Sequence, residues 1–161
     1  MSSHPATQVK AMLVTLSPDG STHLVSHHPP TQENPLGFHR LVGGSVEPGE
    51  THREAVIREV HEELGARIED LTSLDVLESI FMVDGRQGHE IVLVHAGRLD
   101  PAPPQTGGRL TEIDGSVLPV VWRPVADADQ PIPLYPLSSP ISPRESGTAV
   151  VAVPEVTSWN G

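Results

Sequence analysis

The sequence predicts a domain of mixed α and β structure, classed as α/β of the α+β type, with several strands and one helix. Its 161 residues fit a single domain that is large enough to bury a core. Apolar, β-branched segments alternate with turn-forming Pro, Gly and Asp. One segment near residues 51–64 repeats apolar residues at helical spacing. Because only five residues are aromatic, we expect an aliphatic core.

Six segments have the composition that is typical of strands: Val9–Leu16, Thr22–Ser26, Phe38–Val42, Leu74–Val83, Glu90–Ala96 and Leu118–Trp122. Residues 17–20 read Ser-Pro-Asp-Gly, which favours a hairpin between the first two. Residues 84–88 have a loop signature, Pro101–Gly108 is predicted to be a long loop, and Val125–Asp129 a short helical turn. Pro119 indicates a strand start or an edge strand, because proline has no N–H to donate.

The helix is predicted from about Thr51 to Leu64. Thr51 and Glu54 have the spacing of a capping box, in which each side chain accepts a hydrogen bond from the other residue's backbone N–H. Gly65 stands where a helix-ending glycine belongs. At about 100° per residue, one arc of this helix carries the apolar residues Val56, Ile57, Val60 and Leu64.

Negative charge dominates the chain and is concentrated in its middle. The formal net charge is −11, and 12 of the 21 acidic residues lie between Glu47 and Glu90. Long nucleic acids and anionic membranes are held by positive surfaces, so neither is an expected partner. The absence of cysteine excludes disulfides, thiolate zinc sites and a thiol nucleophile.

Three carboxylates share one face of the predicted helix, because Glu59, Glu62 and Glu63 are spaced as i, i+3 and i+4. Like charges at this spacing destabilise a helix, whereas clustered oxygen ligands suit Mg²⁺ or Mn²⁺. The residues alone leave two interpretations open: a divalent-cation site, or an ordinary solvated acidic face.

The same segment resembles the Nudix box, the signature motif of the Nudix hydrolase family. The match runs from Gly44 to Ala66, and its fixed positions are Gly44, Glu50, Arg58, Glu59, Glu62, Glu63 and Gly65. Ala66 departs from the pattern, which prefers a bulkier aliphatic residue there. A match at so many fixed positions is far more specific than a lone glycine motif.

The resemblance implies an α/β/α sandwich with a mixed β-sheet, in which the box forms a loop–helix–loop. It implies hydrolysis of a diphosphate linkage in a nucleoside diphosphate joined to another group, with Mg²⁺ or Mn²⁺ as cofactor. Glu59 and Glu63 would be the principal metal ligands, and the carbonyl of Gly43 would be an additional one. Glu62 would be either a further ligand or the partner of Arg58, which lies four residues before it. Arg58 and Glu50 would hold the loop and the carboxylates in place.

The general base and the substrate contacts are less determined. Glu59 is one candidate base, and the family sometimes uses a later-loop carboxylate, for which Glu112 and then Glu90 are the candidates. An ordinary exposed carboxylate is the alternative interpretation for both. The candidate substrate-binding residues are Arg40 and Arg86, which could bind phosphate, together with Phe81 and Glu112. For stacking on a base or sugar, the candidate side chains outside the tryptophans are Phe81, Tyr135 and Phe38. A nucleotide-sugar, an ADP-ribose-like compound and a nucleoside triphosphate all remain open as substrates.

The Nudix domain is expected to span residues 1–137, followed by a tail, 138–161, that is either an edge strand near Thr148–Val153 or loosely packed. With neither a signal peptide nor an apolar run of membrane-spanning length, the expected location is the cytoplasm, without membrane association. A small nucleotide is the expected partner and a homodimer is possible. A non-catalytic, nucleotide-sensing Nudix-like domain is the alternative function.

Overall fold

The structure is a computed structural model that describes residues 5–136. Its elements, in chain order, are β1 (Gln8–Val14), β2 (Thr22–His28), β3 (Phe38–Ser45), α1 (His52–Leu64), β4 (Arg67–Val83), β5 (Arg86–Asp100), β6 (Gly108–Thr111), β7 (Val117–Pro124) and β8 (Leu134–Tyr135). The predicted tail, including Thr148–Val153, lies outside the described residues. Within them, the structure contains no helix that is long and apolar enough to cross a membrane.

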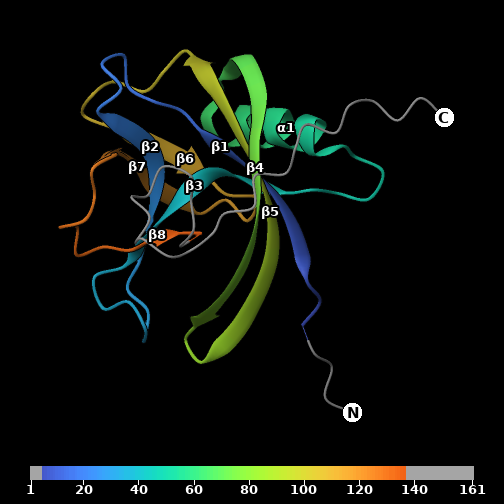
Figure 1. Ribbon diagram of the computed structural model, residues 1–161, viewed down its shortest axis with the longest axis vertical. Coiled ribbons are helices and arrows are strands. Elements are labelled where there is room, and N and C mark those ends of the chain that lie inside the picture. Colours follow the sequence, from blue (N-terminus) through green and yellow to red (C-terminus); the bar gives the residue numbers. More distant parts are fainter. Residues whose placement is uncertain (1–4, 137–161) are drawn as a thin grey trace.

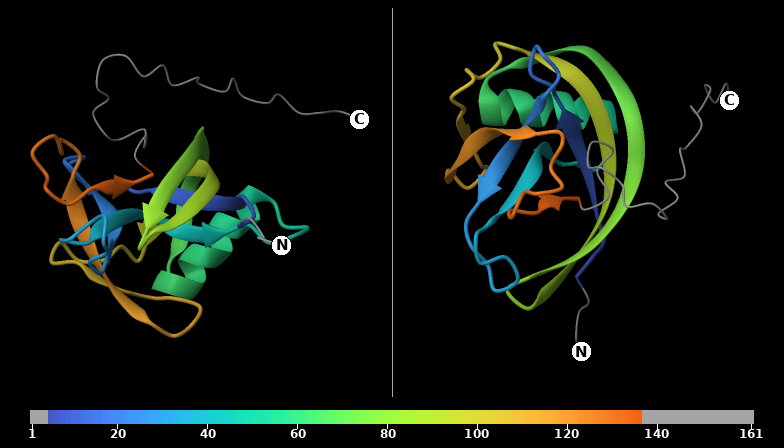
Figure 2. Two further views of the ribbon diagram at one scale, coloured as in Figure 1. Left: turned by 90° about the horizontal axis from the view of Figure 1, so that it is seen from below. Right: turned by 60° about the vertical axis from the view of Figure 1, so that its left-hand side comes forward.

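The strands form one mixed sheet in the order β4-β5-β1-β3-β2-β7-β6, with β8 attached to β3 (Figure 1). β1 runs parallel to β5 and β3 runs parallel to β8, whereas the other neighbours are antiparallel. β4 and β5 make a long hairpin that bends around the rest of the sheet (Figure 2). The predicted α+β class is therefore confirmed.

α1 has the predicted ends. The Thr51 hydroxyl accepts a hydrogen bond from the N–H of Glu54, and the Glu54 carboxylate accepts one from the N–H of Thr51, both at 3.1 Å. Gly65 follows with a left-handed backbone at φ 65°. The predicted apolar arc is wrong at Ile57, which is 43% exposed. The buried residues of the helix are Ala55, Val56 and Val60. Ile57 lies about 100° further around the helix than Val56, so it is turned toward solvent.

Two aliphatic cores lie in the molecule. The first packs α1 on the sheet through residues that include Val56 and Val60 of the helix and Ala11 and Leu13 of β1. The second joins β1, β2, β3, β4, β5 and β8 through Met12, Val14, Val25, Leu41, Leu77, Val92, Val94 and Leu134. Within residues 5–136, α1 is the only helix, and strands rather than a second helix complete this second core.

Several element boundaries differ from the prediction. β4 begins at Arg67 rather than at the predicted Leu74. The composition does not indicate a strand over its first residues, because most of them are polar, and they pair with β5 through two register shifts. Asp84 and Gly85 form a two-residue hairpin turn, a turn that the Asp-Gly dipeptide favours. β5 therefore begins at Arg86, where the sequence predicted a loop. Residues 125–129 form bends and turns, not a helical turn.

The short strands β6 and β8 are not among the predicted ones. Pro119 lies near the start of β7, as predicted. It pairs only with β6, since the pairing of β2 with β7 spans residues 120–124.

Candidate active site

The end of β3 brings the backbone against the carboxylate of Glu59. Gly43 and Gly44 pair with Met12 and Ala11 of β1, and Gly43 has a left-handed φ of 136°. A Cβ on Gly44 would meet the carboxylate oxygens of Glu59 at 2.5 and 2.7 Å, closer than atoms can pack. Glycine at this position is therefore what lets the Glu59 side chain lie flat on the β3 backbone.

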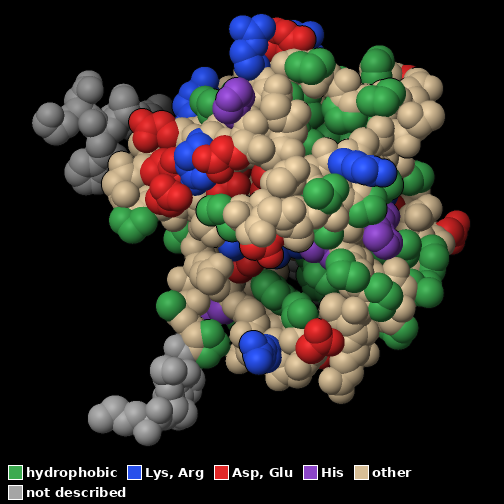
Figure 3. Space-filling view, turned by 180° about the vertical axis from the view of Figure 1, so that it is seen from behind, with side chains coloured by type: hydrophobic (Ala, Val, Ile, Leu, Met, Phe, Trp, Pro, Cys, Tyr) green, Lys and Arg blue, Asp and Glu red, His purple; other side chains and the backbone are tan. Residues whose placement is uncertain are grey.

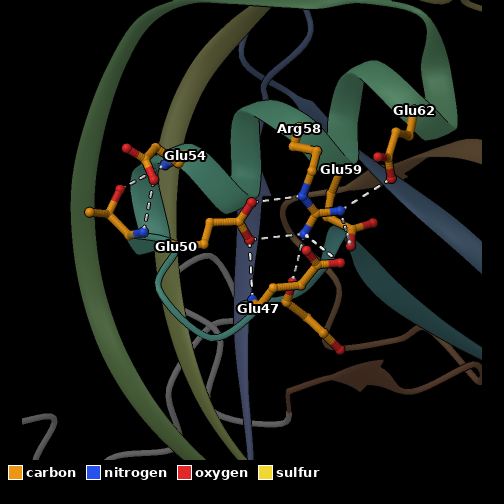
Figure 4. A network of polar contacts seen from close by, with 8 residues as sticks. Glu47, Glu50, Glu54, Arg58, Glu59 and Glu62 are labelled. Carbon is orange, nitrogen blue, oxygen red and sulfur yellow. Dashed lines mark hydrogen bonds and ion pairs between the residues drawn. The ribbon is translucent and has the colours of Figure 1, made fainter.

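Arg58 is the centre of a hydrogen-bond network that connects the loop to the helix (Figure 4). Its Nε and Nη2 donate to the two oxygens of Glu50, at 2.7 and 2.9 Å. Nη2 also donates to the carbonyl of Ser45 at 3.0 Å, and Nη1 donates to Glu59 at 3.0 Å. These hydrogen bonds from Arg58 lower the pKa of Glu50 to about 2. Arg58 and Glu50 thus have the positions expected of residues that hold the loop and a carboxylate in place.

The three helical carboxylates do not act as one face. Glu59 and Glu63 are turned toward the sheet, and the Glu59 side chain is only 14% exposed. Glu62 points away, is 50% exposed, and accepts a hydrogen bond from Arg58 Nη1 at 3.2 Å. Of the two roles expected for Glu62, the structure contains the ion pair with Arg58, because α1 places both side chains on the same side of the helix, and the role as a metal ligand stays a prediction.

Glu59 and Glu63 enter a cleft of about 250 Å³ that is also lined by Gly43, Arg40 and Glu112. Burial raises the pKa of Glu63, and the nearby carboxylates of Glu112 and Glu59 raise it further. Figure 3 shows acidic side chains gathered on one side of the molecule, with a hollow beside them. Three carboxylates around one desolvated space repel one another, and a cation in that space would relieve the repulsion.

The donor set suits Mg²⁺ or Mn²⁺. Within residues 5–136, no three His, Cys, Asp or Glu side chains converge into a complete metal site. Mg²⁺ does not require one, since it usually binds through one or two carboxylates and completes its shell with water and substrate phosphates. Glu59 and Glu63 would supply these carboxylates, and Gly43 also lines the same cleft.

A second, smaller cavity adjoins the cleft and shares Arg40 with it. It is lined by the rings of Phe38, Phe81 and Tyr135, whose centroids lie 5.5 Å apart for Phe38 and Tyr135 and 6.1 Å apart for Phe81 and Tyr135. Arg40 Nη2 donates to Glu90 at 2.9 Å, and the Glu90 side chain is only 8% exposed. Glu90 is therefore the buried partner of Arg40 and lines this aromatic cavity, whereas Glu112 lines the cleft.

Arg86 does not join the other predicted substrate-binding residues. It pairs with Val83 at the tip of the β4–β5 hairpin, is exposed, and lines neither the cleft nor the aromatic cavity. The sequence analysis placed Arg86 in a loop at residues 84–88, whereas the two-residue turn keeps it in the strand β5 of the hairpin. Arg40 and Phe81 do lie near the cleft, and Arg40 lines both cavities.

Sequence reasoning missed Lys10, which lines the cleft from β1. It also missed Asn34, whose amide donates to the Tyr135 hydroxyl at 3.3 Å beside the aromatic cavity. Neither residue belongs to a motif. Their positions follow from strand register and from contacts between distant segments, and the one available signal was that Lys10 is the only lysine of the chain.

Comparisons with known proteins agree with this architecture. A family model described as the NUDIX domain matches residues 6–144. The protein MutT4 of Mycobacterium tuberculosis (strain CDC 1551 / Oshkosh), whose name places it among mutator proteins, is 36% identical over 87 residues. This match covers 54% of the chain and 33% of MutT4, so the chain aligns with about a third of that relative.

Two solved structures show the same fold. The MutT NUDIX hydrolase from Burkholderia pseudomallei superposes with a TM-score of 0.57 at 23% identity, covering 80% of this chain and 91% of that one. A NUDIX hydrolase from Nitrosomonas europaea gives 0.54 at 18% identity, covering 74% of each chain. The family model spans most of the sequence, and the glycine loop, helix and carboxylates of the motif lie together in the fold. The chain belongs to the Nudix family.

Proposed function

We propose that this protein is a Mg²⁺- or Mn²⁺-dependent hydrolase that cleaves a diphosphate linkage in a nucleoside diphosphate joined to another group. The observation that supports it best is the pair Glu59 and Glu63, half-buried in one cleft with the Gly43-Gly44 backbone, with Glu59 held by Arg58. This arrangement concentrates negative charge where a polyphosphate must bind, which is productive only when a divalent cation accompanies the substrate.

In the proposed mechanism, Glu59 and Glu63 hold the metal and Arg58 fixes the Glu59 carboxylate through its hydrogen bond. A divalent ion bound there supplies charge neutralisation for the phosphate oxygens and a more acidic water. Arg40, which also lines the cleft, binds phosphate after exchanging part of its contact with Glu90. The cavity of Phe38, Phe81 and Tyr135 stacks the base or sugar of the substrate.

For the general base we favour Glu112 over Glu59 and Glu90. Glu112 is half-buried in the turn after β6, lines the cleft, and lies close enough to Glu63 to raise its pKa. Glu59 is already engaged by Arg58, and Glu90 by Arg40. A carboxylate without such a cationic partner is better placed to accept a proton from an attacking water.

The test is hydrolysis of a panel of nucleotide-sugars, ADP-ribose and nucleoside triphosphates, with Mg²⁺, with Mn²⁺ and with EDTA, following the released phosphate species. We expect cleavage of at least one substrate that EDTA abolishes. Glu59→Gln and Glu63→Gln should each lose most of the turnover and remain folded. Glu69→Gln is the matched control, because Glu69 is an exposed carboxylate on β4 that pairs with Arg98 outside the cleft.

Wild-type rates in both cleft variants would show that the metal assignment is wrong. Silence across the panel, together with tight binding of one nucleotide, would favour the non-catalytic sensor. The cytoplasmic location, the homodimer and the single domain over residues 1–137 stay predictions; size-exclusion chromatography with light scattering tests the dimer.

A further inference from the structure

Lys10 lies at the junction of the cleft and the β1–β3 pairing. It is the register partner of Ser45, one residue past the Gly43-Gly44 loop, and its ammonium donates to the Ser45 hydroxyl at 2.8 Å. The side chain lines the same cleft as Glu59, Glu63 and Arg40. Neither the family motif nor the proposed mechanism gives this residue a role.

Charged side chains lie near the Lys10 ammonium, but among the described residues none of them forms an ion pair with it. Burial lowers its pKa, Arg40 lowers it further, and Glu90, Glu59 and Glu112 act in the opposite direction. Among the described residues, none of these carboxylates forms an ion pair with Lys10, and Ser45 is its one hydrogen-bond partner. An ammonium carries three N–H donors, so two of them are left for a ligand that enters the cleft.

The chemistry of that ligand follows from the walls of the cleft. The lining combines Glu59 and Glu63, which suit a divalent cation, with the cations Lys10 and Arg40. A group that contacts both the metal and these cations must have several anionic oxygens, some to share with the metal and some to accept N–H donors. A diphosphate has this distribution of oxygens, whereas a carboxylate or a single neutral polar group does not.

We propose that Lys10 binds the non-bridging oxygens of the substrate's diphosphate and, together with Arg40, sets the preference of the cleft for diphosphates over monophosphates. This inference rests on the proposed function for the identity of the substrate but concerns a residue outside the family motif. The competing role is structural, with Lys10 serving only to offset the cleft carboxylates.

The two roles predict opposite effects on different ligands. If Lys10 only offsets carboxylates, its removal strengthens the binding of a cation and leaves the binding of an anion unchanged. If Lys10 binds phosphate, its removal weakens the binding of a diphosphate, whatever it does to the metal. Methylenediphosphonate is a suitable probe, because its P–C–P bridge cannot be hydrolysed and the measurement needs no turnover.

The experiment is calorimetric titration of methylenediphosphonate, and separately of inorganic phosphate, into the full chain in saturating Mg²⁺. Lys10→Met should weaken methylenediphosphonate binding by about tenfold to a hundredfold, the range of a charge-assisted hydrogen bond, and should change phosphate binding less. Lys10→Arg should recover most of the affinity. Arg67→Met is the charge-matched control, since Arg67 is 78% exposed, pairs with Asp100, and lies outside the cleft lining.

A second readout uses the fact that the chain has one lysine. Labelling the protein with ¹³C,¹⁵N-lysine leaves the three N–H donors intact and gives one set of lysine side-chain signals, which should shift when methylenediphosphonate is added in Mg²⁺. Thermal unfolding of each variant shows that it is folded. An unchanged affinity in Lys10→Met, or no binding by the wild type, overturns the proposal. A panel without hydrolysis, combined with weaker binding by Lys10→Met, would reject the proposed function and leave the role of Lys10 standing.

Discussion

Replacing Gly44 with alanine tests the contact between the β3 backbone and Glu59. The new Cβ would lie 2.5 and 2.7 Å from the two carboxylate oxygens of Glu59. Ordinary packing needs about 3.5 Å, so the carboxylate must retreat by about 1 Å. Gly44 does not have a left-handed φ, and the obstructing atoms belong to the end of a flexible side chain, so alanine introduces no backbone strain.

The expected result separates activity from stability. A displacement of about 1 Å at a positioned catalytic group can lower the rate by about a hundredfold, so Gly44→Ala should lose about that factor in kcat/KM. Its thermal midpoint should stay near that of the wild type, because Gly→Ala at an unstrained position reduces the entropy of the unfolded chain and is neutral or slightly stabilising. Steady-state kinetics on the substrate found in the panel, and a thermal melt, measure the two quantities.

Gly108→Ala is the matched control at the start of β6. A Cβ there would meet only Pro103 Cβ, at an ordinary 3.6 Å, so both activity and stability should be retained. If Gly44→Ala keeps wild-type kcat/KM, Glu59 is not held in its working position by this backbone. If Gly44→Ala unfolds, the new Cβ clashes with atoms that cannot move, which contradicts the inference that the Glu59 side chain can retreat.

Two further predictions concern the charged network and a buried histidine. Arg58→Lys should weaken Mn²⁺ binding by about 10- to 100-fold in calorimetry, because an ammonium cannot reach Glu50, Glu59 and the Ser45 carbonyl together. An undiminished affinity would show that the guanidinium of Arg58 does not position the Glu59 carboxylate. His23 is 1% exposed, and burial, then Arg123, lower its pKa to about 4 against a contribution from Asp127. In the unfolded chain His23 takes up a proton near pH 6.5, whereas in the folded protein it does so only near pH 4. The free energy of unfolding is therefore unaffected by His23 above pH 6.5 and falls between pH 6.5 and pH 4, by about 2 kcal/mol at pH 5. In urea unfolding, His23→Leu should flatten the dependence of the free energy of unfolding on pH between 6.5 and 4. At pH 7 it should change that free energy little, because Nδ1 of His23 is buried without a hydrogen-bond partner among the described residues. An unchanged pH dependence would exclude His23 as its source.

The parts of the fold that depend on local signals could be predicted from the sequence. The capping box of Thr51 and Glu54 and the left-handed Gly65 fix the ends of α1 through contacts within a few residues. Apart from the start of β4, the predicted strands lie within about four residues of their observed bounds. β6 and β8 escaped prediction because four- and two-residue strands next to prolines have too little pattern to detect.

Much of the site could be predicted from the sequence, since Glu59 and Glu63 of the motif and Arg40 outside it all line the cleft. Helical spacing left Glu62 either a ligand or the partner of Arg58. The apolar residues decide which side of α1 meets the sheet, and they turn Glu62 toward Arg58 and solvent. Arg86 was misplaced because one turn, at Asp84-Gly85, sets its location. Lys10 enters the cleft through pairing across 35 positions of sequence, which no local pattern encodes.

The most direct test of the central claim is to locate the metal. Crystals of the full chain soaked with Mn²⁺ and methylenediphosphonate, examined by anomalous diffraction at the manganese edge, would show where the ion binds. We predict manganese in the cleft, coordinated by carboxylate oxygens of Glu59 and Glu63 and by oxygens of the diphosphonate. Manganese bound elsewhere, or a cleft that holds the diphosphonate without metal, would contradict the account.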